Sequence, residues 1–288
     1  MEESTKRYSL MVVTGANKEI GFEICRQLAS NGIVVVLISR DEKRGLEAIQ
    51  KLKDSGLSDY LHLALANFIK IQFGKLDILV NNAGVLGAIV DGDALRASGF
   101  GFILPWRWLM MLGFLRICLS SRQTARKYSM KHLLMQHSGA HIDLLQLSDS
   151  PRIVNVSSIM GKLERVSNEW ARETLIDPEN ITVEKVDGIV KAFLEDFKDG
   201  SSEAKGWPAF STAYTISKAA LNAYTRILAK YPSIIVNCAC PGFVKTDANF
   251  NTGILSVEEG TETPVKLALL PNGGPSNCFF VTKEESEF

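Results

Sequence analysis

The sequence has few cysteines, and their spacing suits neither a cross-linked nor a metal-bound fold. Only five cysteines occur in 288 residues, and Cys238 and Cys240 have no further Cys or His at zinc-ligand spacing. We therefore expect reduced, mostly buried thiols, no disulfide scaffold and no metal site.

An excess of charge of one sign is also lacking. The 32 Lys and Arg residues balance the 32 Asp and Glu residues, and no basic run is interleaved with aromatic residues. We therefore expect no nucleic-acid partner. Residues 1–9 are polar and lack the apolar core of a signal peptide, which predicts a cytoplasmic protein.

One apolar stretch, Gly99–Leu119, has about the length that crosses a bilayer. It contains two arginines and the helix-breaking Pro105, which disfavour a membrane span. We expect a segment of a soluble domain with no membrane partner, and we keep a membrane-attached protein as the minor alternative.

Short apolar runs alternate with amphipathic segments along the chain. Leu10–Thr14 is a buried-strand pattern that stops at Gly15, helical spacing of apolar residues begins at Ile20, and Ile33–Ser39 is a second β-branched run. Further strands are expected at Leu76–Val80, Arg152–Val156 and Ile234–Ala239, with a helix at Glu42–Leu52. This alternation predicts an α/β fold, a Rossmann-type doubly wound parallel sheet, in a single domain over residues 1–288.

The first turn, TGANKEIG, runs from Thr14 to Gly21. Glycines there let a cofactor pyrophosphate approach the backbone, and the following helix offers unpaired N–H groups to it. Two glycines at this spacing also suit a plain tight turn, so the motif alone leaves both interpretations open.

Arg40 follows the second strand, where an NAD-binding protein usually carries an acidic residue. Together with Lys18 it suits a 2′-phosphate, which favours NADP(H) over NAD. The alternative is an ordinary solvated charge beside Asp41.

Two further motifs follow strands. Asn81-Asn82-Ala83-Gly84 can tie strand ends together and leave room for a flat ligand, although Asn and Gly are also common in simple turns. Tyr214 and Lys218 lie four residues apart on one predicted helix face, where the ammonium is expected to lower the pKa of the phenol.

These motifs occur in the order of the short-chain dehydrogenase/reductase family, with Ser158 at a strand end and Pro241-Gly242 after a later strand. The sequence resembles that family over Tyr8–Gly92 and Leu144–Phe288. Segments such as TGANKEIGFEICRQLAS resemble its plant menthone, neomenthol and salutaridine reductase branch. The resemblance implies a helical flap insertion between Ser158 and Tyr214, over residues 162–206, and a monomer.

The resemblance also assigns roles. It implies that Tyr214 protonates the carbonyl oxygen and that Ser158 hydrogen-bonds this oxygen. It also implies that Lys218 lowers the pKa of Tyr214 and holds the nicotinamide ribose, and that Thr246 contacts the nicotinamide carboxamide. The cofactor-binding residues that we expect are Gly15, Asn17, Lys18, Ile20, Gly21, Arg40, Asn82, Ala83, Gly84, Tyr214, Lys218, Pro241, Gly242, Val244 and Thr246.

The sequence departs from the family at three places. Glu19 replaces a glycine, and a carboxylate close to a pyrophosphate is expected to weaken binding. The third strand and its Asp are expected to be missing, because residues 58–67 run almost directly into the next helix. Residues 93–143 match nothing in the family, and Met130 stands at the position of its catalytic Asn.

These observations predict an NADPH-dependent oxidoreductase that reduces a ketone to a secondary alcohol on a small apolar substrate, terpenoid-like or alkaloid-like. The alternative is a catalytically impaired family member that keeps the fold and nucleotide binding.

Overall fold

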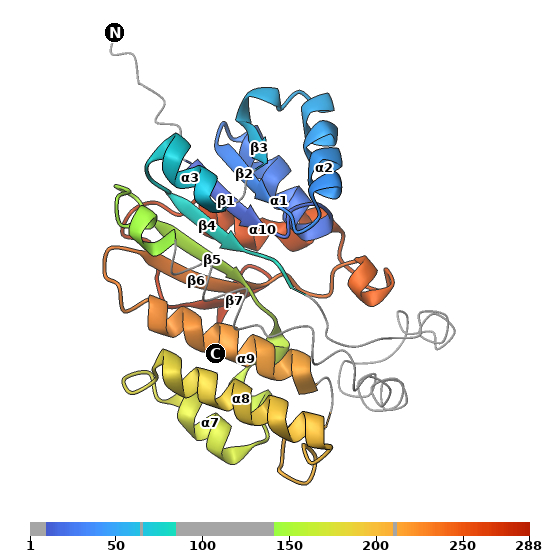
Figure 1. The fold of residues 1–288 in the computed structure, drawn as a ribbon, viewed down its shortest axis with the longest axis vertical. Helices are drawn as coiled ribbons and strands as arrows, with labels where there is room; N and C mark the ends of the chain where they lie inside the picture. Colours follow the sequence, from blue (N-terminus) through green and yellow to red (C-terminus); the bar gives the residue numbers. More distant parts are fainter. Residues whose placement is uncertain (1–9, 64–65, 85–140, 210–211) are drawn as a thin grey trace.

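One mostly parallel sheet organises the chain (Figure 1). The computed structural model describes residues 10–63, 66–84, 141–209 and 212–288. The strands are β1 (Leu10–Thr14), β2 (Val34–Ile38), β3 (Leu61–Leu63), β4 (Ile78–Asn81), β5 (Arg152–Val156), β6 (Ile235–Cys240), β7 (Phe279–Val281) and β8 (Glu284–Ser286). Their order is β3-β2-β1-β4-β5-β6-β7-β8, and only the β7–β8 pair is antiparallel.

Helices cover both faces of this sheet, as the sequence predicted. They are α1 (Glu19–Ser30), α2 (Glu42–Asp54), α3 (Ala66–Phe73), α7 (Glu169–Ile176), α8 (Val183–Asp199), α9 (Thr212–Leu228) and α10 (Val257–Ala268). The 3₁₀ helices are η1 (Ser58–Tyr60), η4 (Ile159–Gly161), η5 (Leu163–Arg165) and η6 (Asp247–Asn249). Buried side chains of α1, α2 and α10 pack on one face, whereas the buried Ile69 of α3 and the partly buried Leu228 of α9 pack on the other.

The two cores explain the uninterrupted apolar pattern of β1. Met11 and Val13 face the core formed with α1, α2 and α10, and Leu10 and Val12 face the opposite core. Because successive strand side chains alternate between faces, a strand covered on both sides has no polar side. Burial of each such side chain contributes roughly 1.5–3 kcal/mol.

The expectation that the third strand is missing is wrong. β3 pairs in parallel with β2, with Leu61 opposite Val35 and Leu63 opposite Leu37. The strand has three residues and follows the turn of η1, so it is too short to show an alternating pattern. It covers the flank of β2, but the sequence after it continues with Ala64 and has no Asp there.

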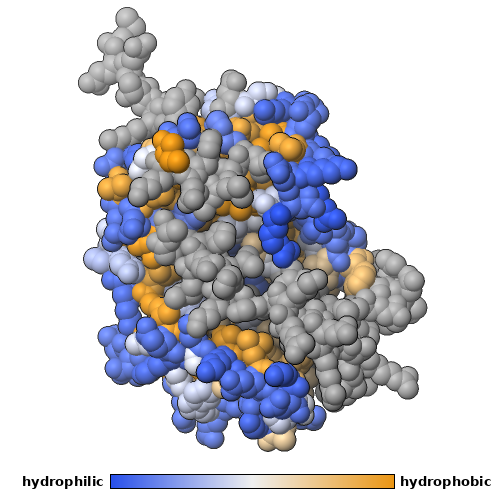
Figure 2. Space-filling model, viewed as in Figure 1, coloured by the Kyte–Doolittle hydropathy of each residue, from blue (hydrophilic) through white to orange (hydrophobic). Residues whose placement is uncertain are grey.

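The flap between Ser158 and Tyr214 is helical, as predicted. α7 and α8 pack against α9 through a separate apolar core, on the side of α9 away from the sheet (Figure 1). Arg226 of α9 donates to the carbonyl oxygens of Leu175 (2.6 Å) and Ile176 (3.0 Å) at the end of α7. Apolar side chains gather over α9 in the same view, whereas α2 presents a polar surface (Figure 2).

No helix among the described residues is both long and apolar enough to span a bilayer. The stretch Gly99–Leu119 and the position of Met130 lie outside the described residues.

Candidate active site

The first turn packs directly against the segment after β4. Gly15 has a φ of +63°, and a Cβ there would lie 2.8 Å from the Cα of Ala83. A Cβ on Gly21 would collide with the side-chain nitrogen of Asn82. Both glycines are therefore required by close backbone packing, before any ligand is considered.

Asn82 and Thr14 hold the two strand ends together. Asn82 Nδ2 donates to the carbonyl oxygens of Thr14 (3.1 Å) and Gly15 (3.2 Å). In return, Thr14 Oγ1 accepts from the N–H groups of Asn82 (3.0 Å) and Ala83 (3.1 Å). This reciprocal pairing confirms the prediction that asparagine after β4 ties strand ends by bonding backbone groups.

The start of α1 suits an anion. Its first-turn N–H groups have no acceptor within the helix, and its N-cap, Lys18, makes no side-chain capping bond. The positive end of the helix dipole lies at the same place. Asn17 and Ile20, on either side of this helix start, are half-buried.

Arg40 and Lys18 do not share a partner. Arg40 is exposed after β2, and the neighbouring Asp41 caps α2 by accepting from the N–H of Arg44 (3.0 Å). Lys18, which the sequence placed with Arg40, instead donates to Asp247 (2.6 Å). In this geometry a 2′-phosphate would depend on Arg40 for its positive charge.

The three expected catalytic residues converge at the carboxyl end of β5. Ser158 follows β5, and its side chain lies close enough to Tyr214, in the first turn of α9, to lower the pKa of that phenol. The Nζ of Lys218 donates to the carbonyl oxygen of Val156 (2.8 Å) and lies 5.7 Å from the ring centroid of Tyr214. A Cβ on Gly84 would lie 3.8 Å from the same Nζ, so the segment after β4 borders this centre.

Burial sets the protonation of this centre. It raises the pKa of Tyr214 to about 12, against the opposing effect of the hydrogen bond with Ser158. Burial also lowers the pKa of Lys218 to about 8. The net shift of the Tyr214 pKa is upward, the opposite of the direction expected from the sequence, because desolvation of the tyrosinate is its largest cause. Tyr214 is a protonated donor at neutral pH.

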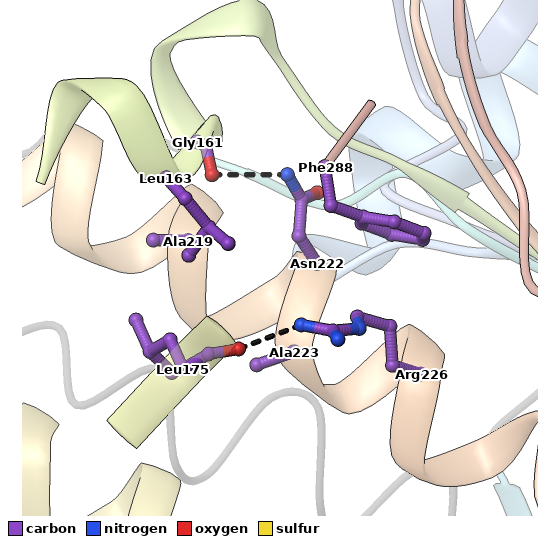
Figure 3. Close-up of a pocket in the computed structure, with 8 residues that line it drawn as sticks. All are labelled: Gly161, Leu163, Leu175, Ala219, Asn222, Ala223, Arg226 and Phe288. Atoms are coloured by element: carbon purple, nitrogen blue, oxygen red, sulfur yellow. Dashed lines mark hydrogen bonds between the residues drawn. The ribbon is translucent and has the colours of Figure 1, made fainter. Parts of the chain in front are cut away.

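A buried residue that the sequence analysis missed supports this centre. Asn222 Oδ1 accepts from the Ser157 hydroxyl (2.5 Å), and its Nδ2 donates to the carbonyl oxygen of Gly161 (3.1 Å; Figure 3). A Cβ on Gly161 would lie 2.5 Å from the backbone carbonyl carbon of Lys218. The signal available in the sequence is the position of Asn222, four residues after Lys218 on the same helix face.

The loop after β6 supplies the remaining predicted residues. Pro241 and Gly242 begin it, and Gly242 has a φ of +85°. The Val244 side chain is buried against Gly260, so any contact of Val244 with a cofactor would be through its backbone. Thr246 is buried at the start of η6.

This arrangement has close counterparts among known proteins. The chain is 52% identical to (+)-neomenthol dehydrogenase of Arabidopsis thaliana. The alignment has 306 positions and covers all of both chains. The chain belongs to the short-chain dehydrogenase family. The family model described as short chain dehydrogenase matches residues 9–98 of it.

Two further proteins are similar to this short-chain dehydrogenase. The solved structure of salutaridine reductase from Papaver somniferum aligns with a TM-score of 0.85 and 46% identity, over 95% of this chain and 99% of that one. Carbonyl reductase [NADPH] 1 of Bos taurus is 33% identical over 94% of this chain and 95% of its own.

The residues of this short-chain dehydrogenase fit NADP(H). The turn from Thr14 to Gly21 offers free helix N–H groups, Arg40 offers a cation where NAD-binding proteins carry an acid, and Lys218 lies beside Tyr214 where the nicotinamide end is expected. Which of the predicted residues contact the cofactor stays a prediction.

The pKa of Lys218 predicts the pH dependence of ketone reduction. Below about pH 8 Lys218 is an ammonium that can hold the ribose, and it loses this charge as the pH rises through 8. Tyr214 stays protonated over the same range, because its pKa is about 12. We expect kcat/KM for reduction to fall above about pH 8 while the dissociation constant of NADPH rises. A flat profile between about pH 6 and pH 10 would contradict this assignment.

Asn222→Leu should destabilise the protein and slow the reaction. The substitution leaves the Ser157 hydroxyl and the Gly161 carbonyl without their partner, which costs about 1–3 kcal/mol of unfolding free energy. Urea unfolding measures this cost, and kcat is compared well below the unfolding transition. Asn31→Leu is the control, because Asn31 is exposed at the end of α1 and its side chain donates to the carbonyl oxygen of Gln27 in the same helix. An unchanged unfolding free energy would show that Asn222 has no part in holding this region.

Proposed function

We propose that this enzyme uses NADPH to reduce a ketone to a secondary alcohol on a small apolar molecule of the terpenoid or alkaloid type. The observation that carries the proposal is the convergence of Ser158, Tyr214 and Lys218 at the end of β5, where the Nζ of Lys218 lies 5.7 Å from the ring centroid of Tyr214. The names of the similar proteins, (+)-neomenthol dehydrogenase and salutaridine reductase, support the substrate class.

In the proposed reaction, two hydroxyl groups receive the ketone oxygen. Ser158 donates a hydrogen bond to this oxygen and orients it towards Tyr214. When bound, NADPH supplies the hydride that reaches the carbonyl carbon. Tyr214 gives its proton to the oxygen, so that the C=O bond becomes an alcohol, and the positive charge of Lys218 stabilises the tyrosinate that results.

The alternative is an impaired member of the family that binds nucleotide without turnover. The sequence favours this alternative at one point, since no Asn occurs between Asn82 and Asn155 and Met130 stands at the expected position. Among the described residues, Lys218 Nζ donates to the backbone carbonyl oxygen of Val156 (2.8 Å) rather than to a side chain that could carry a proton onward.

Turnover of cyclic ketones, menthone among them, decides between the two. NADPH consumption by the purified enzyme is measured by its absorbance, and Tyr214→Phe is the matched variant that lacks only the hydroxyl. We expect turnover in the parent and a loss of about 10²- to 10⁴-fold in the variant, with NADPH still bound. A folded parent that binds NADPH and reduces none of the ketones would support the impaired alternative.

We further propose that the enzyme acts as a cytoplasmic monomer. α7 and α8 cover the outer surface of α9, so a second copy has no access to that helix. Light scattering coupled to size-exclusion chromatography should give the mass of one chain, 31.7 kDa. A dimer mass at micromolar concentration would overturn the monomer.

A further inference from the structure

Glu19, the first residue of α1, has a backbone conformation that favours glycine. Its φ is +50°, in the left-handed region where a side chain strains the backbone. The strain needs a compensating interaction, because glycine would adopt the same conformation freely.

The carboxylate of Glu19 bonds to a loop that is distant in the sequence. Its Oε1 accepts from the N–H of Asp247 (2.5 Å), the first residue of η6. The neighbouring Lys18 donates to the Asp247 carboxylate (2.6 Å) and lies 3.7 Å from Glu19 Oε1. The hydrogen bond from Lys18 holds the pKa of Asp247 below its usual range, so this carboxylate stays charged at neutral pH.

This contact joins two segments that are expected to hold different parts of the cofactor, the pyrophosphate and the nicotinamide carboxamide. Glu19 belongs to the phosphate-binding turn, whereas Asp247 directly follows Thr246, the residue expected at the nicotinamide carboxamide. The loop around Thr246 is internally braced, because Asn249 accepts from the Thr246 N–H (3.2 Å) and donates to the Val244 carbonyl oxygen (2.7 Å). A displacement of Asp247 therefore also displaces Thr246.

We propose that Glu19, assisted by Lys18, is a positioning residue that fixes the Thr246 loop over the nicotinamide half of NADP(H). The proposal rests on NADP(H) as the cofactor. It reverses the expectation from the sequence, in which a carboxylate at this position repels the pyrophosphate and weakens binding.

Two substitutions distinguish the effect of the hydrogen bond between Glu19 and Asp247 from repulsion of the pyrophosphate by the Glu19 carboxylate. Glu19→Gly removes the carboxylate and also accepts a φ of +50° without strain, so backbone misfit cannot explain a loss. Glu19→Gln keeps a side-chain oxygen for the Asp247 N–H and removes the negative charge. Thermal unfolding of each variant checks that the fold is retained.

The binding of two ligands locates the effect. NADPH spans both segments, whereas 2′,5′-ADP has the adenosine half alone and does not reach the Thr246 loop. We expect Glu19→Gly to raise the dissociation constant of NADPH about 2- to 10-fold, the range for loss of one hydrogen bond. The dissociation constant of 2′,5′-ADP should not change. Glu19→Gln should bind NADPH as tightly as the parent or more tightly. Calorimetric titration measures both ligands.

Three results would overturn the proposal. If Glu19→Gly binds NADPH as tightly as the parent or more tightly, the carboxylate repels the pyrophosphate or has no effect. If Glu19→Gly weakens the binding of both ligands equally, Glu19 acts on the phosphate-binding turn alone. If the folded parent binds neither ligand, the cofactor assignment fails as well, and this result is distinct from the other two because it is seen before any substitution.

Discussion

The hydrogen bond between Ser157 and Asn222 fixes the end of β5 against α9, and the catalytic geometry depends on it. Ser158 belongs to the strand side of this contact, whereas Tyr214 and Lys218 belong to the helix side. A shift of α9 along the sheet would separate the two hydroxyls that must meet one carbonyl oxygen. Gly161 has no side chain, so its backbone packs directly against the backbone of Lys218. This close packing opposes such a shift.

Burial of this region shifts the pKa values of its two ionisable groups in opposite directions, because it disfavours the charged form of each. It favours the neutral phenol of Tyr214, which keeps the proton that reduction consumes, and it disfavours the ammonium of Lys218. The same desolvation strengthens every charge interaction formed there, since water no longer screens it. A site with these properties holds a weak acid in place at neutral pH.

Much of the fold could be predicted because β1 and β5 are covered on both faces, so their apolar runs matched the observed bounds of Leu10–Thr14 and Arg152–Val156. The expected ends of β2, β4 and β6 differ from the observed ones by one or two residues. β3 was missed because three residues carry no periodicity, and β7 and β8 were not predicted for the same reason.

The candidate site was predictable where one motif contains both partners, as with Tyr214 and Lys218. It was not predictable where the partners are distant in the sequence. Lys18 pairs with Asp247, and Asn222 of α9 accepts from Ser157 at the end of β5. The direction of the Tyr214 pKa shift also required the fold, because the extent of burial cannot be obtained from residue spacing.

The hydrogen bonds from Arg226 to the end of α7 have a consequence for how the flap can evolve. Arg226 binds the main-chain oxygens of Leu175 and Ile176, and every amino acid carries such an oxygen. The attachment of the flap to the catalytic helix at this point therefore does not depend on which side chains the flap carries. Substitutions in the flap can therefore change the surface that it presents while these two hydrogen bonds to α9 are retained.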